Sequence, residues 1–337
     1  SLNRVVRSLE ESTQAGTAFV FGYLGGGELP FEASESVSTY LFAFRALPLI
    51  IFLSALSSLF FYWKILPIVV GFFSRILERT LRLGGAEGLG VAGNIFLGMV
   101  ESPLFVRPYL VNMSRSELFT VMASGMATIA GTVMVLYASI LSDVVPNVLG
   151  HILTASILNA PAAVVISKLL IPQTEKSTSG KLTDPEPLHN SMEAITQGTL
   201  RGVQLFLNVV AMLIVLVALV YLCNLILGLL PNVGAEPITL QRLFGIVMAP
   251  VVWLMGIPWS ESGVAGALMG TKTVINELVA YLDMGQLPEG ALSSRSYLIL
   301  TYAMCGFANP GSVGIMIGGL GTLVPERRSE IVSLGFR

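Results

Sequence analysis

Charged residues are scarce in this sequence. Asp, Glu, Lys and Arg make up 12% of its 337 residues, about half of the roughly 25% that is usual for a soluble domain. The formal net charge is −2 and no basic cluster occurs, so nothing in the sequence indicates a nucleic-acid partner. In contrast, 53% of the residues are hydrophobic and the mean hydropathy is +0.76. This composition predicts an all-α polytopic membrane protein.

Cysteine and histidine are also rare, with two residues of each. Cys223 and Cys305 both lie in apolar runs and cannot form a disulfide framework. The two histidines show no metal-binding spacing such as His-Glu-x-x-His, which argues against an intramembrane enzyme. The chain does not begin with Met, and no basic segment followed by an apolar core opens it. We therefore expect residues of the natural protein to precede Ser1.

Apolar runs of different lengths alternate with polar stretches along the chain. Crossing a hydrocarbon core of about 30 Å takes about 20 apolar residues. By length and by placement of charge, the predicted segments are an interfacial amino-terminal segment (1–39), a transmembrane helix (40–63), an interfacial helix (64–83), a re-entrant hairpin (84–112), a broken transmembrane helix (116–143), a transmembrane helix (149–172), a soluble linker (173–194), a transmembrane helix (195–231), an interfacial helix (239–258), a second re-entrant hairpin (260–285), a second broken transmembrane helix (294–325) and the start of a missing final span (326–337).

Two glutamates lie between apolar runs that are too short to cross a membrane. Glu101 is flanked by glycine and proline and is expected at the tip of the first hairpin. Glu277 holds a similar place in the second. A carboxylate at membrane depth is costly unless it lines a cavity and meets a partner. Both glutamates are therefore predicted to face a polar solute.

Two otherwise uncharged spans contain residues that disfavour a continuous helix. The first includes Thr128–Thr132 and the second Gly306–Ser312, which contains a proline. Similar triplets, Ser114–Ser116 and Ser294–Ser296, open the two spans. A hairpin followed by a broken span thus occurs twice, which predicts the inverted repeat of secondary transporters. Glycines that only assist helix packing would not explain the paired glutamates, and a passive channel lined by broken helices remains an alternative.

Several motifs occur in an order that resembles the concentrative nucleoside transporter family. They are Glu-x-Pro-Leu and Arg-Pro-Tyr-Leu within 98–110, Ser-Glu-Leu at 116–118, Ala-Thr-Ile-Ala-Gly at 127–131, Ala-Pro at 160–161 and Cys-Gly-Phe-Ala-Asn at 305–309. The likeness covers about residues 40–328. It implies a homotrimer in the plasma membrane, the inner membrane of a bacterium, that takes up nucleosides by symport with a cation and moves as an elevator. It implies no enzymatic activity and no cofactor besides the coupling ion, and further spans before and after this chain.

The resemblance also assigns roles to individual residues. It implies that the nucleoside contacts Met99, Val100, Glu101, Val133, Glu277, Phe307, Asn309 and Ser312, the first four at the nucleobase and the others at or near the ribose. It implies a sodium site formed by the side chains of Asn94 and Thr128 and the carbonyls of Leu97 and Ile129. Oxygen ligands suit a hard cation.

The chain departs from the family pattern at two of these places. Many relatives carry Gln-Thr where this chain has Met99-Val100, so two polar groups that contact the base are lost. The base preference is therefore open, and a purine or modified nucleoside is one alternative. Thr128 replaces a serine common in relatives and keeps the hydroxyl. Sodium is the favoured coupling ion, with proton-coupled symport as the alternative.

Overall fold

The computed structural model describes residues 2–30, 41–99, 101–180, 188–232 and 237–336, and within these ranges every regular element is a helix. The helices are α1 (Leu2–Phe21), η1 (Gly22–Gly25), α2 (Phe42–Arg45), α3 (Leu49–Tyr62), α4 (Ile65–Leu81), α5 (Gly85–Asn94), η2 (Ser102–Val106), α6 (Arg107–Leu110), α7 (Arg115–Ala127), α8 (Gly131–Ile140), α9 (Val148–Leu170), α10 (Ser191–Leu227), α11 (Leu240–Leu254), η3 (Trp259–Glu261), α12 (Ser262–Val274), α13 (Glu277–Gly285), α14 (Ser294–Ala303), α15 (Pro310–Leu323), η4 (Pro325–Arg327) and α16 (Arg328–Gly335). The all-α prediction is confirmed.

The same order of elements occurs twice. A helical hairpin, α5 to α6, is followed by the interrupted helix α7–α8, and a second hairpin, α12–α13, is followed by the interrupted helix α14–α15. The first interruption covers 128–130 and the second 304–309. Each overlaps the stretch in which glycine, proline and hydroxyl residues predicted a broken helix, 128–132 for the first and 306–312 for the second.

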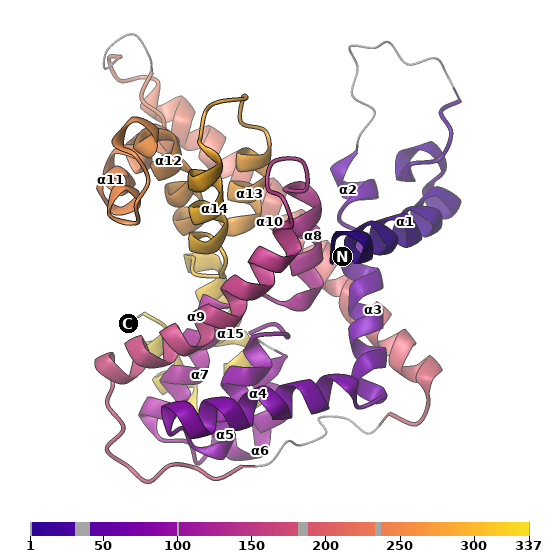
Figure 1. Ribbon diagram of the computed structural model, residues 1–337, viewed down its shortest axis with the longest axis vertical. Coiled ribbons are helices and arrows are strands. Elements are labelled where there is room, and N and C mark those ends of the chain that lie inside the picture. The colour runs from indigo at the N-terminus through magenta and orange to yellow at the C-terminus, as the bar shows by residue number, and fades with distance from the viewer. Residues whose placement is uncertain (1, 31–40, 100, 181–187, 233–236, 337) are drawn as a thin grey trace.

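Two hydrophobic cores lie on either side of α9. The first contains buried residues of α3, α8, α12, α13 and α14, and the second those of α4, α5, α7, α15 and α16. Helix α9 contributes Ile152 and Ala155 to the first core and Ala160 and Val164 to the second. In Figure 1, α9 crosses the centre of the molecule between these two groups of helices.

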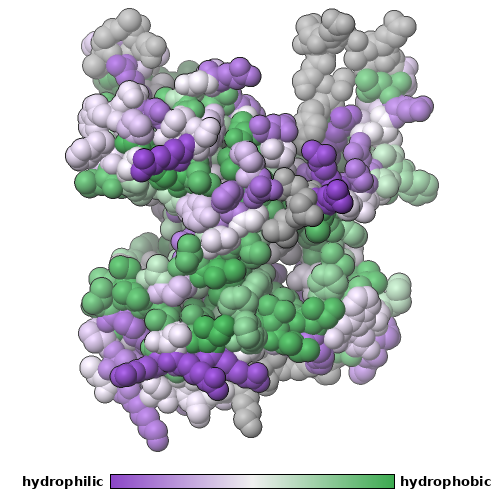
Figure 2. Space-filling model, viewed as in Figure 1, coloured by the Kyte–Doolittle hydropathy of each residue, from purple (hydrophilic) through white to green (hydrophobic). Residues whose placement is uncertain are grey.

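Four stretches of helix are long and apolar enough to cross a membrane: Phe42–Tyr62, Arg115–Ile140, Val148–Leu170 and Ser191–Leu227. The most apolar window of α10 has none of its residues buried. Leu207, Ile214 and Leu222 on this helix are 53%, 65% and 52% exposed. A continuous apolar surface of this kind needs lipid or another apolar surface to cover it. Figure 2 shows broad hydrophobic faces on the molecule.

Helix α4 has the character expected of a helix at the membrane surface. Val70 and Leu77 are buried against the protein, whereas Arg75, Arg79 and Arg82 are exposed. Figure 2 shows a strip of hydrophilic residues near the lower edge, where Figure 1 places α4. Such an arrangement is typical of an interfacial helix.

The structure corrects two boundaries. Helix α10 begins at Ser191, inside the predicted linker 173–194, because the Asn190 side chain accepts a hydrogen bond from the Glu193 N–H and caps the helix there. The first broken span begins earlier than the predicted 116: Ser114 is its N-cap and forms a capping box with Glu117. Helix α14 begins at Ser294, the predicted first residue of the second broken span, and Ser293 is its N-cap.

Candidate functional site

A cavity of about 260 Å³ lies where the two hairpins and the two helix interruptions meet. Seven of the predicted substrate residues line it: Met99, Glu101, Val133, Glu277, Phe307, Asn309 and Ser312. The eighth, Val100, lies outside the described residues. Helix α10 closes one side with residues that include Leu205, Asn208 and Met212. Residues more than two hundred positions apart in the sequence, such as Met99 and Ser312, thus share one cavity.

Glu277 is the most constrained acidic group of this cavity. It is 5% exposed and is the first residue of α13, so its carboxylate lies at the positive end of that helix. Tyr137 Oη donates a hydrogen bond to Glu277 Oε1 at 2.7 Å. Asn309 Nδ2 donates to Oε2 at 3.2 Å. Both carboxylate oxygens are therefore held in place by groups from α8 and α15.

Asn309 is oriented by the helix that it caps. Its Oδ1 accepts the Ser312 N–H at 2.8 Å, and Pro310 occupies the first helical position of α15. Because Oδ1 is used by the cap, Nδ2 is directed at Glu277. The sequence Asn-Pro-Gly-Ser thus serves two purposes, since it starts the half-helix and places a donor beside the acid.

Glu101 lies at the turn of the first hairpin. Its Oε2 accepts the Gly98 N–H at 2.8 Å, which closes the turn. Glu101 lines the main cavity and also a smaller one of about 100 Å³ that extends between α3 and α10. It can therefore meet a solute from either side.

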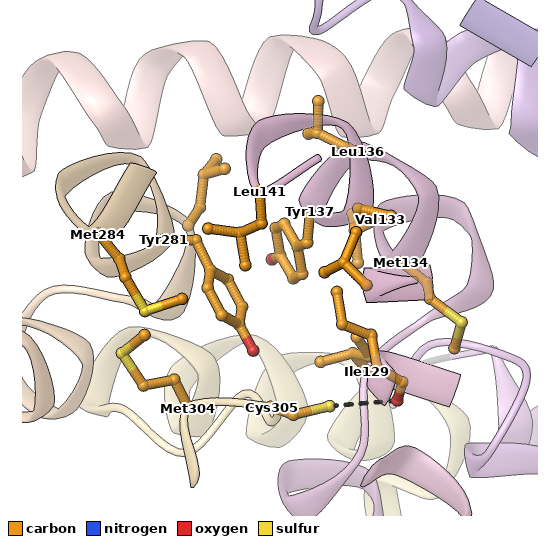
Figure 3. Packing of buried hydrophobic residues seen from close by; sticks show 14 of the residues in the cluster. Ile129, Val133, Met134, Leu136, Tyr137, Leu141, Tyr281, Met284, Met304 and Cys305 are labelled. Atoms are coloured by element: carbon orange, nitrogen blue, oxygen red, sulfur yellow. Dashed lines mark hydrogen bonds between the residues drawn. The ribbon is translucent and has the colours of Figure 1, made fainter. Parts of the chain in front are cut away.

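Two residues of the cavity wall were missed by the sequence analysis. Tyr137 looks like a core aromatic in sequence, and its ring packs 5.0 Å from that of Tyr281, as Figure 3 shows. Its hydroxyl nevertheless binds Glu277. Thr132 lines the cavity, and its Oγ1 is buried with no hydrogen-bond partner among the described residues. Spacing could have indicated both, since Thr132 is next to Val133 and Tyr137 is one helical turn beyond it.

The predicted cation ligands lie on two neighbouring segments. Asn94 is fully buried, and its Nδ2 donates to Val121 O at 3.0 Å and to Ser124 Oγ at 2.8 Å. Thr128 Oγ1 donates to Ser124 O at 2.8 Å. Asn94 and Thr128 are therefore both bonded to Ser124. Leu97 and Ile129 are buried in the adjoining unwound segments, which are joined by the hydrogen bond from Gly131 N–H to Phe96 O at 3.0 Å.

The donor set of this cluster suits a monovalent cation. Asn94 Oδ1 is buried and has no hydrogen-bond partner within the described part of the chain. Because both hydrogens of its amide are used, this oxygen has a fixed direction and a free lone pair. The described residues contain no cluster of His, Cys, Asp and Glu that would hold a transition metal. Neutral oxygens of this kind are ligands for a hard cation such as sodium.

Comparison with known proteins identifies the family of this chain. A family model described as "Na+ dependent nucleoside transporter C-terminus" matches residues 151–337, and one described as "Nucleoside recognition" matches residues 43–144. This chain belongs to the concentrative nucleoside transporter family. The predicted family is thereby confirmed, and with it an integral membrane transporter instead of an enzyme.

Several relatives in this family resemble the chain over nearly its whole length. It is 37% identical to the nucleoside permease NupC of Helicobacter pylori, in an alignment that covers 96% of this chain and 76% of that protein. It is 35% identical to sodium/nucleoside cotransporter 1 of Rattus norvegicus, with 96% and 50% coverage, so it spans half of that longer protein. The solved structure of the transporter CNTnw in an inward-facing, substrate-bound state superposes with a TM-score of 0.86 at 35% identity, covering 98% of this chain and 79% of that one.

Proposed function

We propose that this protein takes up nucleosides by symport with sodium. The observation that supports this most directly is the pairing of Glu277 with Tyr137 and Asn309 inside a cavity bounded by two hairpins and two broken helices. A ribose offers a pair of hydroxyls, and a carboxylate accepts hydrogen bonds from hydroxyls more strongly than neutral groups do. Relatives named as sodium/nucleoside cotransporters support the same class of cargo.

In this proposal, the ribose and the base of the nucleoside contact different groups of cavity residues. Glu277, Asn309 and Ser312 bind the ribose, with Phe307 beside it, and all four line the cavity. Met99, Glu101 and Val133 lie on the opposite segments and hold the base, with Val100 as the remaining family position. A thioether and a valine offer contact area and no hydrogen bonds, so the base is selected mainly by shape and by Glu101.

The coupling ion in this proposal is sodium bound by Asn94, Thr128 and the carbonyls of Leu97 and Ile129. The free, fully buried Asn94 Oδ1 supports it, because a buried oxygen without a partner costs about 1 to 3 kcal/mol. A proton is the alternative ion, since two carboxylates face the cavity. A passive channel is the alternative of another class.

We further propose that the hairpins are re-entrant and that the protein is a homotrimer. In this proposal α3 and α10 belong to the part of the protein that stays still in the membrane while the rest moves during transport. These two helices pack closely, since a Cβ on Gly198 would lie 2.7 Å from the Ala55 Cα and one on Gly202 would lie 2.7 Å from the Ile51 Cα. The uncovered apolar face of α10 suits lipid or a neighbouring subunit in the plasma membrane. The cavity between α10 and the hairpins would then open to either side as the rest of the molecule moves as an elevator.

The test is uptake of radiolabelled uridine and adenosine by the purified protein in liposomes. An imposed inward sodium gradient should drive accumulation above equilibrium, and a sodium ionophore should abolish it. Accumulation driven by a proton gradient alone would favour the proton-coupled alternative. Uptake that stops at equilibrium under every gradient would indicate a channel. No uptake of any nucleoside would contradict the proposed substrate class.

A further inference from the structure

Helix α9 contributes no residue to the lining of the cavity, yet its side chains bind backbone carbonyls in the turn of the first hairpin and beside both helix interruptions. Ser156 and Asn159 lie three residues apart, on one face of the helix. Ser156 Oγ donates to Ile95 O at 3.2 Å, in the turn of the first hairpin. Asn159 Nδ2 donates to Ala127 O at 3.0 Å and to Cys305 O at 2.6 Å.

The two carbonyls that Asn159 binds are the ones that the helix interruptions leave without helical partners. In a continuous helix, Ala127 O would accept from the N–H of residue 131 and Cys305 O from that of residue 309. Here the Gly131 N–H donates to Phe96 O at 3.0 Å and the Asn309 N–H to Phe307 O at 2.8 Å. One side-chain amide, with two hydrogens, therefore replaces one missing backbone donor in each broken helix.

The two interruptions are also in direct backbone contact. A Cβ on Gly306 would lie 2.7 Å from Ala127 O, so any side chain at Gly306 would push the two segments apart. Beside this contact, Cys305 Sγ lies 3.7 Å from Ile152 O of α9, and Figure 3 draws this hydrogen bond below the buried tyrosines. The ends of α7 and α14 are thus joined to each other and to α9 at one point.

The two chain segments that meet at this junction continue into the two proposed ligand sites, the cation site after Ala127 and the ribose site after Cys305. Ala127 directly precedes Thr128 and Ile129, which belong to the proposed cation cluster. Cys305 lies two residues before Phe307 and four before Asn309, the residue that positions Glu277. A change in the direction of either carbonyl would move the shared amide, and with it the other carbonyl. Contiguous packed groups of this kind are the physical basis for coupling between sites.

We propose that Asn159 is a positioning residue that couples the cation site to the ribose site. Binding of the cation orders the segment after Ala127, and Asn159 transmits this order to the segment after Cys305, so that Asn309 and Glu277 are held ready for the ribose. This inference rests on the proposed function, since it requires sodium-coupled nucleoside binding. Asn159 itself touches neither ligand.

The test is to measure the coupling between the two ligands. The dissociation constant of a nucleoside, with uridine and adenosine as probes, is determined for the purified protein without sodium and with saturating sodium. The ratio of the two values is the coupling factor, and by linkage the nucleoside must change the sodium affinity by the same factor. The variants are Asn159→Ala, which removes the amide, and Asn159→Leu, which removes it and fills its volume. Thr154→Val is the matched control, because Thr154 is exposed on α9 and its hydroxyl bonds only within the helix, to Gly150 O.

We expect both Asn159 variants to lower the coupling factor by about fivefold or more, the equivalent of one net hydrogen bond, and Thr154→Val to leave it unchanged. The reciprocal sodium measurement should fall by the same factor. Should the Asn159 variants melt at a lower temperature but retain the wild-type coupling factor, Asn159 is only a structural tie and the inference is overturned. If either variant fails to fold, the other decides. A wild-type protein whose nucleoside affinity ignores sodium would overturn the proposed function itself, and this outcome is seen before any variant is made.

Discussion

Replacing Glu277 with glutamine tests the ribose site with a minimal change. The substitution turns one carboxylate oxygen into an NH2 group. Tyr137 can rotate its hydroxyl hydrogen away and accept from that NH2, whereas Asn309 Nδ2 needs an oxygen opposite it. We therefore expect the amide to take the orientation that satisfies both neighbours, so that the fold is retained. What is lost is the negative charge that a ribose hydroxyl would bind.

The size of the effect follows from that single lost charge. A hydrogen bond to a charged group contributes roughly 1.5 to 3 kcal/mol, and 1.4 kcal/mol corresponds to a factor of ten in affinity. Glu277→Gln should therefore weaken nucleoside binding by about one to two orders of magnitude and nearly abolish uptake at low substrate concentration. Equilibrium binding of labelled uridine and adenosine to the purified protein measures the first, and uptake into liposomes the second.

Asp283→Asn is the matched control for this experiment. It removes the same charge from the same helix, α13, but Asp283 is exposed and is not among the residues that line the cavity. We expect it to bind nucleosides as the wild type does. If Glu277→Gln also binds and transports with wild-type affinity while the protein stays folded, Glu277 does not contact the substrate and the proposed site is wrong.

Three further variants, one of them a double substitution, test other parts of the molecule. Thr128→Val keeps the branched shape and removes the hydroxyl, so the sodium concentration for half-maximal uptake should rise severalfold; an unchanged sodium dependence would exclude Thr128 as a ligand. Met99→Gln combined with Val100→Thr restores two polar groups beside the base and should raise the ratio of uridine to adenosine uptake, whereas a constant ratio in intact protein would remove both residues from the base site. Glu117→Ala should lower the melting temperature and reduce the free energy of unfolding by about 2 to 5 kcal/mol. The reason is that the fully buried Glu117 carboxylate accepts hydrogen bonds from Ser114 N–H, Thr178 N–H and Thr178 Oγ1. A free energy of unfolding within about 0.5 kcal/mol of the wild-type value, the usual effect of a surface substitution, would contradict this.

The helix interruptions were predictable because local chemistry causes them. Pro310 cannot continue a preceding helix and suits the first position of the next one, and Asn309 is a preferred cap. The hairpins were predictable from length alone, since apolar runs around Glu101 and Glu277 are too short to cross a membrane. Both features depend on residues that are adjacent in the sequence, so they can be predicted without knowing the fold.

The partners of the site residues were not predictable in the same way. Tyr137 and Glu277 are 140 positions apart, and Asn159 and Cys305 are 146 apart. An asparagine in an apolar span could equally face lipid, a cavity or another helix. Its two carbonyl partners become visible only when the interruptions from both halves of the chain are brought together. The resemblance to a family supplied residues that are proposed to contact ligands, and it supplied no residue that acts through another one.

Interrupting an apolar helix leaves backbone carbonyls that need other hydrogen-bond donors, and the structure supplies donors for several of them. Each interruption leaves backbone carbonyls without helical partners, and an unpaired polar group is costly where water is absent. Phe96 O receives the Gly131 N–H, Ile95 O receives Ser156, and Asn159 serves one carbonyl of each broken helix. These four carbonyls are therefore held in fixed directions.

Two buried side-chain oxygens near the cavity lack the hydrogen-bond partners that these carbonyls have within the described residues. Asn94 Oδ1 lies in the proposed cation cluster and Thr132 Oγ1 in the cavity wall, and neither has a hydrogen-bond partner among the residues described. Each costs about 1 to 3 kcal/mol while unpaired. In the proposed function, the cation would pair with Asn94 Oδ1 and the nucleoside with Thr132 Oγ1, so binding of the two ligands would remove this cost at both atoms.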